Sequence, residues 1–164
     1  MDTPDSMAAA LIDRILTGAA DLTLATLRGD GSPHASTVNF AHSGWQLYTA
    51  ISLDSGKAHD INHDHRVALT VNLPYSDWHD IQGLAIDGEA AFVTDPQELA
   101  RVAALLRSKL PAFDTIIERP HVLPWPGMLF LRITPHTVSL LDYTRGYGHT
   151  ERYRIAPEES GGAA

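Results

Sequence analysis

Three short segments of the sequence combine residue types that could do chemistry. The first is Ser55-Gly56-Lys57, in which a hydroxyl, a flexible backbone and an ammonium group stand side by side. Where such a segment leads into a helix, these groups and the unpaired amides at the helix start can converge on a phosphate. A motif this short needs structural context, because an isolated Ser-Gly-Lys is more often a solvated turn.

The second segment is rich in histidine. His59 and His63 stand four residues apart, so on a helix both imidazoles lie on one face, in an arrangement similar to that of zinc sites. A catalytic zinc also needs a third ligand and supporting hydrogen bonds, and the sequence identifies neither. We therefore predict no metal site and interpret the two histidines as part of a polar helix face.

The third segment is the glycine-rich turn Gly146-Tyr147-Gly148-His149 near the end of the chain. Tyr147 could lie against a planar ligand, although glycine pairs mark turns as readily as they mark binding loops. The three tryptophans of the chain could also stack on a ring. Large aromatic side chains serve cores and interfaces more often than cofactors, so this pattern assigns them no firm role.

The composition narrows the chemistry open to these segments. The chain has no cysteine, which excludes disulfides, thiolate metal sites and cysteine nucleophiles, so any redox chemistry must come from a cofactor. Its formal net charge of −8 opposes nucleic-acid binding, which needs a clustered Lys/Arg surface. No apolar run approaches the ~20 residues that cross a membrane, and the start of the chain lacks a signal-peptide pattern. We expect a cytoplasmic protein that binds neither nucleic acid nor membrane.

The elements that must position these segments fit one domain over residues 1–164. An N-terminal helix is expected within residues 1–19, with Ser6 as its cap and Gly18 as its stop. A short helix is expected within 55–65, and a longer one over 96–109 behind Asp95 as cap, with Glu98 completing a capping box. The last residues, 156–164, are expected to form a flexible tail.

Strands are expected over the alternating and β-branched stretches, and glycines mark the turns and bends between them. Asp30-Gly31 predicts a tight hairpin with positive φ angles, and Gly83 and Gly88 predict bulges or bends of the kind that close barrels. The expected strands are 22–28, 34–40, 45–51, 67–73, 81–94, 128–134 and 137–143. Because no regular alternation of strand and helix is present, we predict a mainly β fold, a small antiparallel barrel with peripheral helices.

Residues 22–71 resemble the first half of the flavin-binding split barrel of the pyridoxamine 5'-phosphate oxidase family. LATLRGDGSPHASTVNF is similar to that family's opening hairpin, and LYTAISLDSGKAHDINHDHRVALTV to its strand, Ser-x-Lys, short helix and Arg-Val-Ala-Leu strand. The resemblance continues through GLAIDGEAAFVTDPQE and FLRITPHTVSLLDY, and LLDYTRGYGHT is similar to a general-stress-protein-like subgroup. It implies a six- to seven-stranded antiparallel split β-barrel.

The resemblance also implies FMN as the cofactor and the residues that would hold it. Ser55 and Lys57 would contact the phosphate, the second strand of the hairpin and Ser52 would line the ring and ribityl chain, and Gln82 would lie near the ring. The residues so assigned to cofactor binding are Ser36, Thr37, Val38, Asn39, Ser52, Ser55, Lys57, Gln82, Trp125 and Tyr147.

The family pattern further implies a homodimer with cofactor sites at its interface, where Trp125 or Tyr147 could reach the partner's flavin. The chain departs from this pattern at Ser36, where many relatives carry an arginine that helps to hold the phosphate, so Arg66 becomes another possible donor. The substrate-binding arginines and histidine of the vitamin-salvage oxidase have no counterparts here. That specific activity is therefore not expected.

The main hypothesis is an FMN-dependent oxidoreductase that acts on a small-molecule substrate, which the sequence does not identify. No catalytic residue is assigned, because the flavin ring itself carries the hydride or electrons. Two alternatives stay open. One is a flavin- or haem-binding protein without turnover, in which one of the nine histidines could be an iron ligand. The other is a deazaflavin-dependent reductase on the same scaffold.

Overall fold

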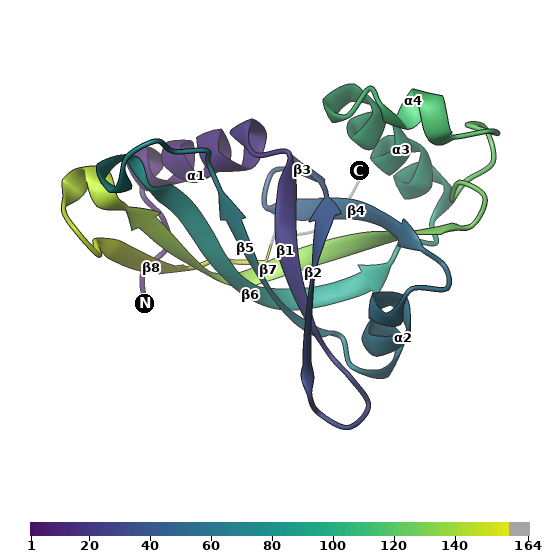
Figure 1. The fold of residues 1–164 in the computed structure, drawn as a ribbon, viewed down its shortest axis with the longest axis horizontal. Helices are drawn as coiled ribbons and strands as arrows, with labels where there is room; N and C mark the ends of the chain where they lie inside the picture. Colours follow the sequence, from purple (N-terminus) through teal and green to yellow (C-terminus); the bar gives the residue numbers. More distant parts are fainter. Residues whose placement is uncertain (158–164) are drawn as a thin grey trace, which may run out of the picture.

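One antiparallel sheet of eight strands, curled on itself, forms the body of the molecule (Figure 1). This computed structural model describes residues 1–157. The strand order is β2-β1-β5-β6-β7-β4-β3, and β8 pairs with the second half of β7. The strands are β1 Asp21–Leu27, β2 Pro33–Asn39, β3 Ala41–Ser43, β4 Gln46–Ser52, β5 Arg66–Asn72, β6 Gln82–Phe92, β7 Met128–Asp142 and β8 Thr150–Arg154. The mainly β split-barrel fold predicted from the sequence is confirmed, with one strand more than the expected six or seven.

The turn between β1 and β2 differs from its prediction in one detail. Gly31 has a positive φ of 82°, whereas Asp30 does not share this conformation. The Asp30 carboxylate instead accepts a hydrogen bond from the Ser32 amide at 2.9 Å, which closes the turn with a side chain. The hairpin therefore needs one glycine-like backbone angle rather than two.

The long strands β6 and β7 bend together at a bulge. Their register shifts between Asp87 and Gly88, and a Cβ added at Gly88 would lie 2.3 Å from the carbonyl oxygen of Thr134. Pro135 pairs with Gly88 at this bulge, where the ladder is interrupted and the missing N–H of proline is tolerated. The bulge predicted at Gly88 is thus confirmed. At Gly83 the register with both neighbouring strands continues, so no bulge lies there. The predicted break of β7 after residue 134 is wrong.

The N-terminal helix α1 spans Ser6–Gly18, and its N-cap is Asp5, one residue before the predicted cap Ser6. The Asp5 side chain, not that of Ser6, accepts a hydrogen bond from the Ala8 amide at 2.8 Å. A carboxylate also interacts more favourably with the helix dipole than a hydroxyl does. Gly18 lies inside the helix and Ala19 closes it.

The other helices are α2 (Gly56–His63), α3 (Pro96–Lys109), α4 (Phe113–Ile116) and the short 3₁₀ turns η1 (Trp78–Asp80) and η2 (Tyr143–Arg145). Asp95 caps α3 as predicted, but the expected capping box is wrong. The Glu98 side chain turns to Arg132 on β7, with two contacts of 2.7 and 2.8 Å. This ion pair fastens α3 to the sheet.

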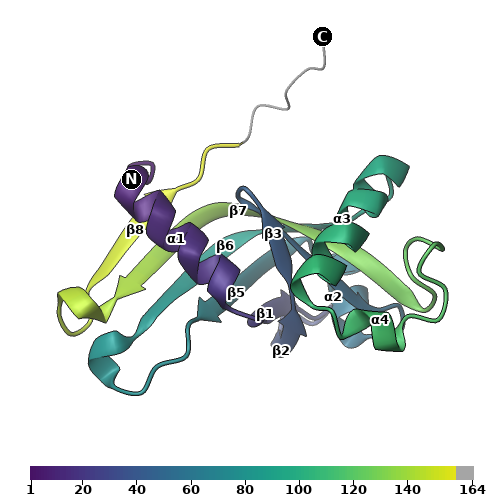
Figure 2. The same ribbon diagram turned by 90° about the horizontal axis from the view of Figure 1, so that it is seen from above.

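Two hydrophobic clusters fill the interior. The larger one lies between the curled sheet and α1, which contributes Ile12, Ile15 and Leu16. The smaller one joins α3 to β3 and β4 around Trp125 and Phe130. Figure 2 shows α1 and α3 well apart along the sheet. Within residues 1–157 no helix is both long and apolar enough to span a membrane, and the predicted tail falls outside this range beyond Pro157.

Candidate functional site

A cleft of about 260 Å³ lies between β2, at one end of the strand order, and β4, near the other end. These two strands share no ladder, and where they approach, the Thr49 hydroxyl donates to the carbonyl oxygen of Asn39 at 2.6 Å. We call this space the seam cleft. Its lining residues are Thr37, Val38 and Asn39 of β2, Ala50, Ile51 and Ser52 of β4, Lys57 of α2 and Phe113 of α4. It brings together five of the ten residues predicted to bind the cofactor.

Lys57 is the one charged side chain that lines the seam cleft within the described part of the chain. It is half-buried, and no residue from 1 to 157 accepts a hydrogen bond from its ammonium group or forms an ion pair with it. It also lies in the first turn of α2, where the backbone amides lack helical acceptors and the helix dipole is positive. The cleft therefore offers an uncompensated positive charge beside hydroxyl and amide groups.

Ser55 and Ser36 do not line the seam cleft. The Ser55 hydroxyl caps α2 by accepting from the Ala58 amide at 3.2 Å, and Ser55 lines a different cavity on another side of this helix. Ser36 lies opposite Leu24 in the β1–β2 ladder, and its buried hydroxyl has no hydrogen-bond partner among residues 1–157. Arg66, the alternative phosphate donor, is held by Asp64 at 2.6 Å and also lies outside the cleft.

Gln82 lies at the opposite end of the sheet from Lys57. Ser52, beside the seam cleft, pairs with Met128 at the start of β7, whereas Gln82 pairs with Asp142 at its end. The 15 residues of β7 separate the two positions by up to roughly 45 Å of strand. The Gln82 side chain accepts a hydrogen bond from Arg14 at 2.8 Å and donates one to Asp142 at 2.9 Å. Figure 1 shows α2, which carries Lys57, and the start of β6, where Gln82 lies, at opposite ends of the sheet, so one chain does not bring the two residues together.

The two aromatic residues predicted to reach a partner's flavin differ in exposure. Trp125 is 1% exposed and packs between Phe113 and Phe130, with ring centroids 5.3 and 4.8 Å away. Its ring therefore packs in the smaller core cluster of its own chain, and its contact with a partner's flavin stays a prediction. Tyr147 is 82% exposed and lies at the Gln82 end of the sheet, beside Trp78. It remains available for a contact.

Helix α2 is held in place by a polar contact that sequence reasoning missed. Asp60, 4% exposed, accepts hydrogen bonds through Oδ2 from Thr26 Oγ1 at 2.7 Å and from His34 Nδ1 at 2.9 Å. Burial alone would raise the pKa of Asp60, but the bonds from His34 and Thr26 keep it below its usual value. The carboxylate is therefore ionised, so the imidazole nitrogen donates. Neither His59 nor His63, which drew attention in the sequence, takes part.

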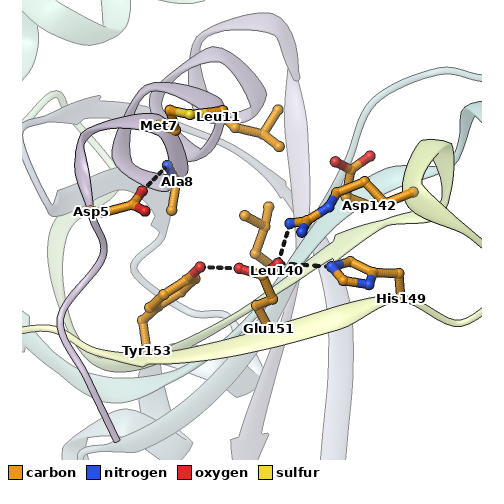
Figure 3. Close-up of a pocket in the computed structure, with 10 residues that line it drawn as sticks. Asp5, Met7, Ala8, Leu11, Leu140, Asp142, His149, Glu151 and Tyr153 are labelled. Atoms are coloured by element: carbon orange, nitrogen blue, oxygen red, sulfur yellow. Dashed lines mark hydrogen bonds and ion pairs between the residues drawn. The ribbon is translucent and has the colours of Figure 1, made fainter.

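A second polar cavity, of about 410 Å³, lies between α1 and the β7–β8 hairpin. Figure 3 shows Glu151 between His149 and Tyr153, with Met7 and Leu11 of α1 across from them. Glu151 accepts hydrogen bonds from His149 at 2.8 Å, from Tyr153 and from Arg145. The bonds from Tyr153 and His149 lower the pKa of Glu151 to about 2, and the first of them raises the pKa of Tyr153 to about 12. These groups satisfy one another, so we assign no ligand to this cavity.

The match to a known protein family agrees with the fold described above. The family model of pyridoxamine 5'-phosphate oxidase matches residues 10–142, which is most of the chain. No curated protein sequence matches it. Among residues 1–157 no group of three or more histidine, aspartate or glutamate side chains is arranged to hold a metal ion.

Solved structures with the same fold come from several bacteria. A heme binding protein from Mycobacterium smegmatis superposes with a TM-score of 0.75 at 21% identity, over 94% of this chain and 60% of that one. The chain thus spans less than two thirds of that relative. HutZ, the heme storage protein from Vibrio cholerae, gives a TM-score of 0.63 at 19% identity, over 76% of this chain and 87% of its own.

General Stress Protein 26 from Bacillus anthracis str. Sterne is a third such structure, with a TM-score of 0.65, 23% identity and coverage of 90% of this chain and 98% of that one. At these identities the superpositions establish the fold. Together with the match over residues 10–142, they confirm the resemblance that the sequence motifs carried. The chain belongs to the pyridoxamine 5'-phosphate oxidase family.

Proposed function

We propose that the protein binds FMN at the seam cleft, with the phosphate on Lys57. The observation that carries this proposal is the ammonium group of Lys57, which has no partner and no acidic neighbour in the cleft lining among residues 1–157. Thr37, Asn39 and Ser52 line the same cleft and offer hydroxyl and amide partners for a polyhydroxyl chain. Membership of the family supports a flavin as the ligand.

The size of the seam cleft suits part of such a cofactor. Its volume of about 260 Å³ is below the ~300–1,000 Å³ of typical small-molecule pockets. One chain would thus hold the phosphate and the ribityl chain, and the ring would extend toward a second subunit. This supports the proposed homodimer with cofactor sites at its interface, to which Gln82 and Tyr147 of the partner chain could contribute.

The proposed activity is that of an oxidoreductase acting on a small-molecule substrate. Bound flavin would supply hydride or electron transfer, and the chain would bind the cofactor, orient it and leave room over the ring. Lys57 would neutralise phosphate charge, and the hydroxyl and amide groups of the cleft would fix the ribityl chain. No acid–base residue of the chain is required for this role.

The first experiment measures FMN affinity by quenching of flavin fluorescence. We expect Lys57→Ala to weaken binding about 10- to 100-fold, because a charge-assisted contact contributes roughly 1.5–3 kcal/mol. Lys57→Arg keeps the charge and should retain most of the affinity. Arg66→Ala serves as the matched control, since Arg66 is engaged by Asp64 outside the cleft. Full FMN affinity in Lys57→Ala would refute the phosphate assignment.

Haem is a second candidate ligand, supported by the names of two structural relatives, the heme binding protein and the heme storage protein. The absorbance spectrum of the purified protein discriminates between the two. Flavin gives absorbance in the blue that increases on addition of FMN, whereas haem gives a Soret band that shifts when its ligating histidine is replaced. Tighter binding of a deazaflavin than of FMN would instead favour the deazaflavin-dependent reductase.

A further inference from the structure

Helix α2 presents Lys57 to the seam cleft, yet its own sequence does little to hold it there. It has eight residues, whereas isolated helices shorter than ~12–15 residues are marginal in water. Ala58 and Ile61 bury their side chains in the larger core cluster. The third buried side chain of α2 is that of Asp60. Because a charged group is costly to bury, Asp60 needs specific hydrogen-bond partners in this position.

Asp60 connects α2 to both strands of the opening hairpin. One of its two carboxylate oxygens, Oδ2, accepts hydrogen bonds both from Thr26 of β1 and from His34 of β2. If this buried carboxylate lost either partner, it would lose one of the hydrogen bonds that offset the cost of burying its charge. The position of α2 in which both hydrogen bonds form is therefore favoured. The strand β2 that carries His34 is also the strand that carries Thr37 and Asn39 into the seam cleft.

The spacing within α2 transfers this constraint to Lys57. Asp60 follows Lys57 by three residues, which on a helix places the two side chains on neighbouring positions of one face, about one turn apart. The start of α2 also lies close to the same histidine, because a Cβ added at Gly56 would lie 3.3 Å from His34 Cε1. The contacts of His34 and Thr26 with Asp60 therefore constrain the rotation of a helix whose start is capped by Ser55.

We propose that Asp60, together with Thr26 and His34, acts as a positioning site that orients α2 and so holds the Lys57 ammonium group in the seam cleft. The three residues stand outside the lining of the cleft and act through Lys57. The proposal rests on the proposed function for the identity of the ligand. It predicts that the buried hydroxyl of Thr26, a residue of β1 that is 3% exposed, controls the affinity for FMN.

The test compares FMN affinity in Thr26→Val, which keeps the shape but removes the hydroxyl, and in Thr26→Ser, which keeps the hydroxyl. We expect affinity about tenfold lower in Thr26→Val and near the wild-type value in Thr26→Ser, at the lower end of the ~10- to 100-fold losses known for residues that orient metal ligands. His34→Ala removes the other hydrogen bond from a partly exposed ring and should act in the same direction. Unchanged affinity in both Thr26→Val and His34→Ala would overturn the proposal.

A double-mutant cycle separates positioning from general destabilisation. If Thr26 acts through Lys57, Thr26→Val should weaken FMN binding less than twofold in the Lys57→Ala background. Additive losses in the double variant would contradict this coupling. Ile12→Val, on the core-facing side of α1, is the control for lost stability. It should lower the melting temperature without changing FMN affinity, and an equal loss of affinity there would show that Thr26→Val acts through stability alone.

Hydrogen exchange of the ligand-free protein distinguishes this proposal from the proposed function. We expect Thr26→Val to increase the exchange rates of the α2 amides about tenfold while those of α1 stay unchanged. If wild-type protein binds no FMN but α2 responds in this way, the function falls and the positioning role stands. If α2 exchange is the same in wild type and Thr26→Val, the positioning role is refuted whatever the protein binds.

Discussion

Lys57 gives the seam cleft a positive charge in a chain whose formal net charge is −8. No carboxylate lines this cleft within the described residues, and Lys57 stands at the positive end of the α2 dipole. At physiological ionic strength, exposed charges farther away than about 8 Å are largely screened. The acidic composition of the chain therefore does not oppose binding of an anionic ligand at this point.

Glu151 provides a prediction at the same scale. Its pKa is about 2 in the folded protein against 4.5 for the free side chain, so ionised Glu151 stabilises the folded state above pH 4.5. This contribution is lost as the pH falls from 4.5 toward 2. We expect the difference in unfolding free energy between wild type and Glu151→Gln to be largest near neutral pH and to shrink over that range. Urea unfolding at about pH 7, 4.5 and 3 measures it, and a constant difference would contradict it.

Of the residues that line the seam cleft, Lys57 stood out in a local pattern, and Thr37, Val38, Asn39 and Ser52 were implied by the family resemblance. The residues that anchor α2 were predicted by neither. Lys57 and Ser52 belong to a strand, turn and helix that are contiguous in the sequence. The partners of Asp60 stand 26 and 34 residues away from it, at His34 and Thr26. Their meeting depends on strand pairing and helix packing, for which a single sequence carries no periodic signal.

Gly88 provides a prediction at the scale of elements, because β6 and β7 can pair along their length only if this residue lacks a side chain. A Cβ there would lie 2.3 Å from the Thr134 carbonyl oxygen, a backbone atom that cannot move aside easily. We expect Gly88→Ala to lower the free energy of unfolding by about 2–4 kcal/mol. The control is Gly29→Ala, with nothing within 4 Å of its Cβ. Denaturant unfolding decides, and equal stabilities of the two variants would count against the bulge.

The strands also differ in how well the sequence predicts them. Alternating stretches such as LTLATLR gave β1 within one residue. The predicted break of β7 falls at Pro135 and His136. A proline is unfavourable inside a strand, and the bulge opposite it explains why β7 continues. β8 alternates exposed and half-buried residues along TERYR, three of which are charged, and it pairs with one strand only. Such an edge strand lacks the apolar alternation that identifies a strand in a sequence.

For the whole molecule, the distribution of predicted cofactor residues is the main constraint. Lys57 and Gln82 lie toward opposite ends of β7, so one chain does not bring the two residues together. Exposed aromatic side chains gather at the Gln82 end, where Trp78 is 45% and Tyr147 82% exposed. Aromatic residues of this kind are enriched in protein interfaces. A two-fold dimer that sets the Gln82 end of one subunit against the seam cleft of the other would satisfy both observations.

This arrangement predicts that two variants, each lacking one group of the FMN site, form one complete site when they are combined in a heterodimer. Lys57→Ala and Gln82→Ala homodimers should each bind FMN about tenfold or more weakly, since every site lacks one group. In the heterodimer of the two variants, one site carries both substitutions and the other carries neither. Differently tagged chains, refolded together and purified by both tags, should therefore bind one FMN per dimer with wild-type affinity, as measured by fluorescence titration. Two weak sites in the heterodimer would show that Lys57 and Gln82 do not meet across the interface.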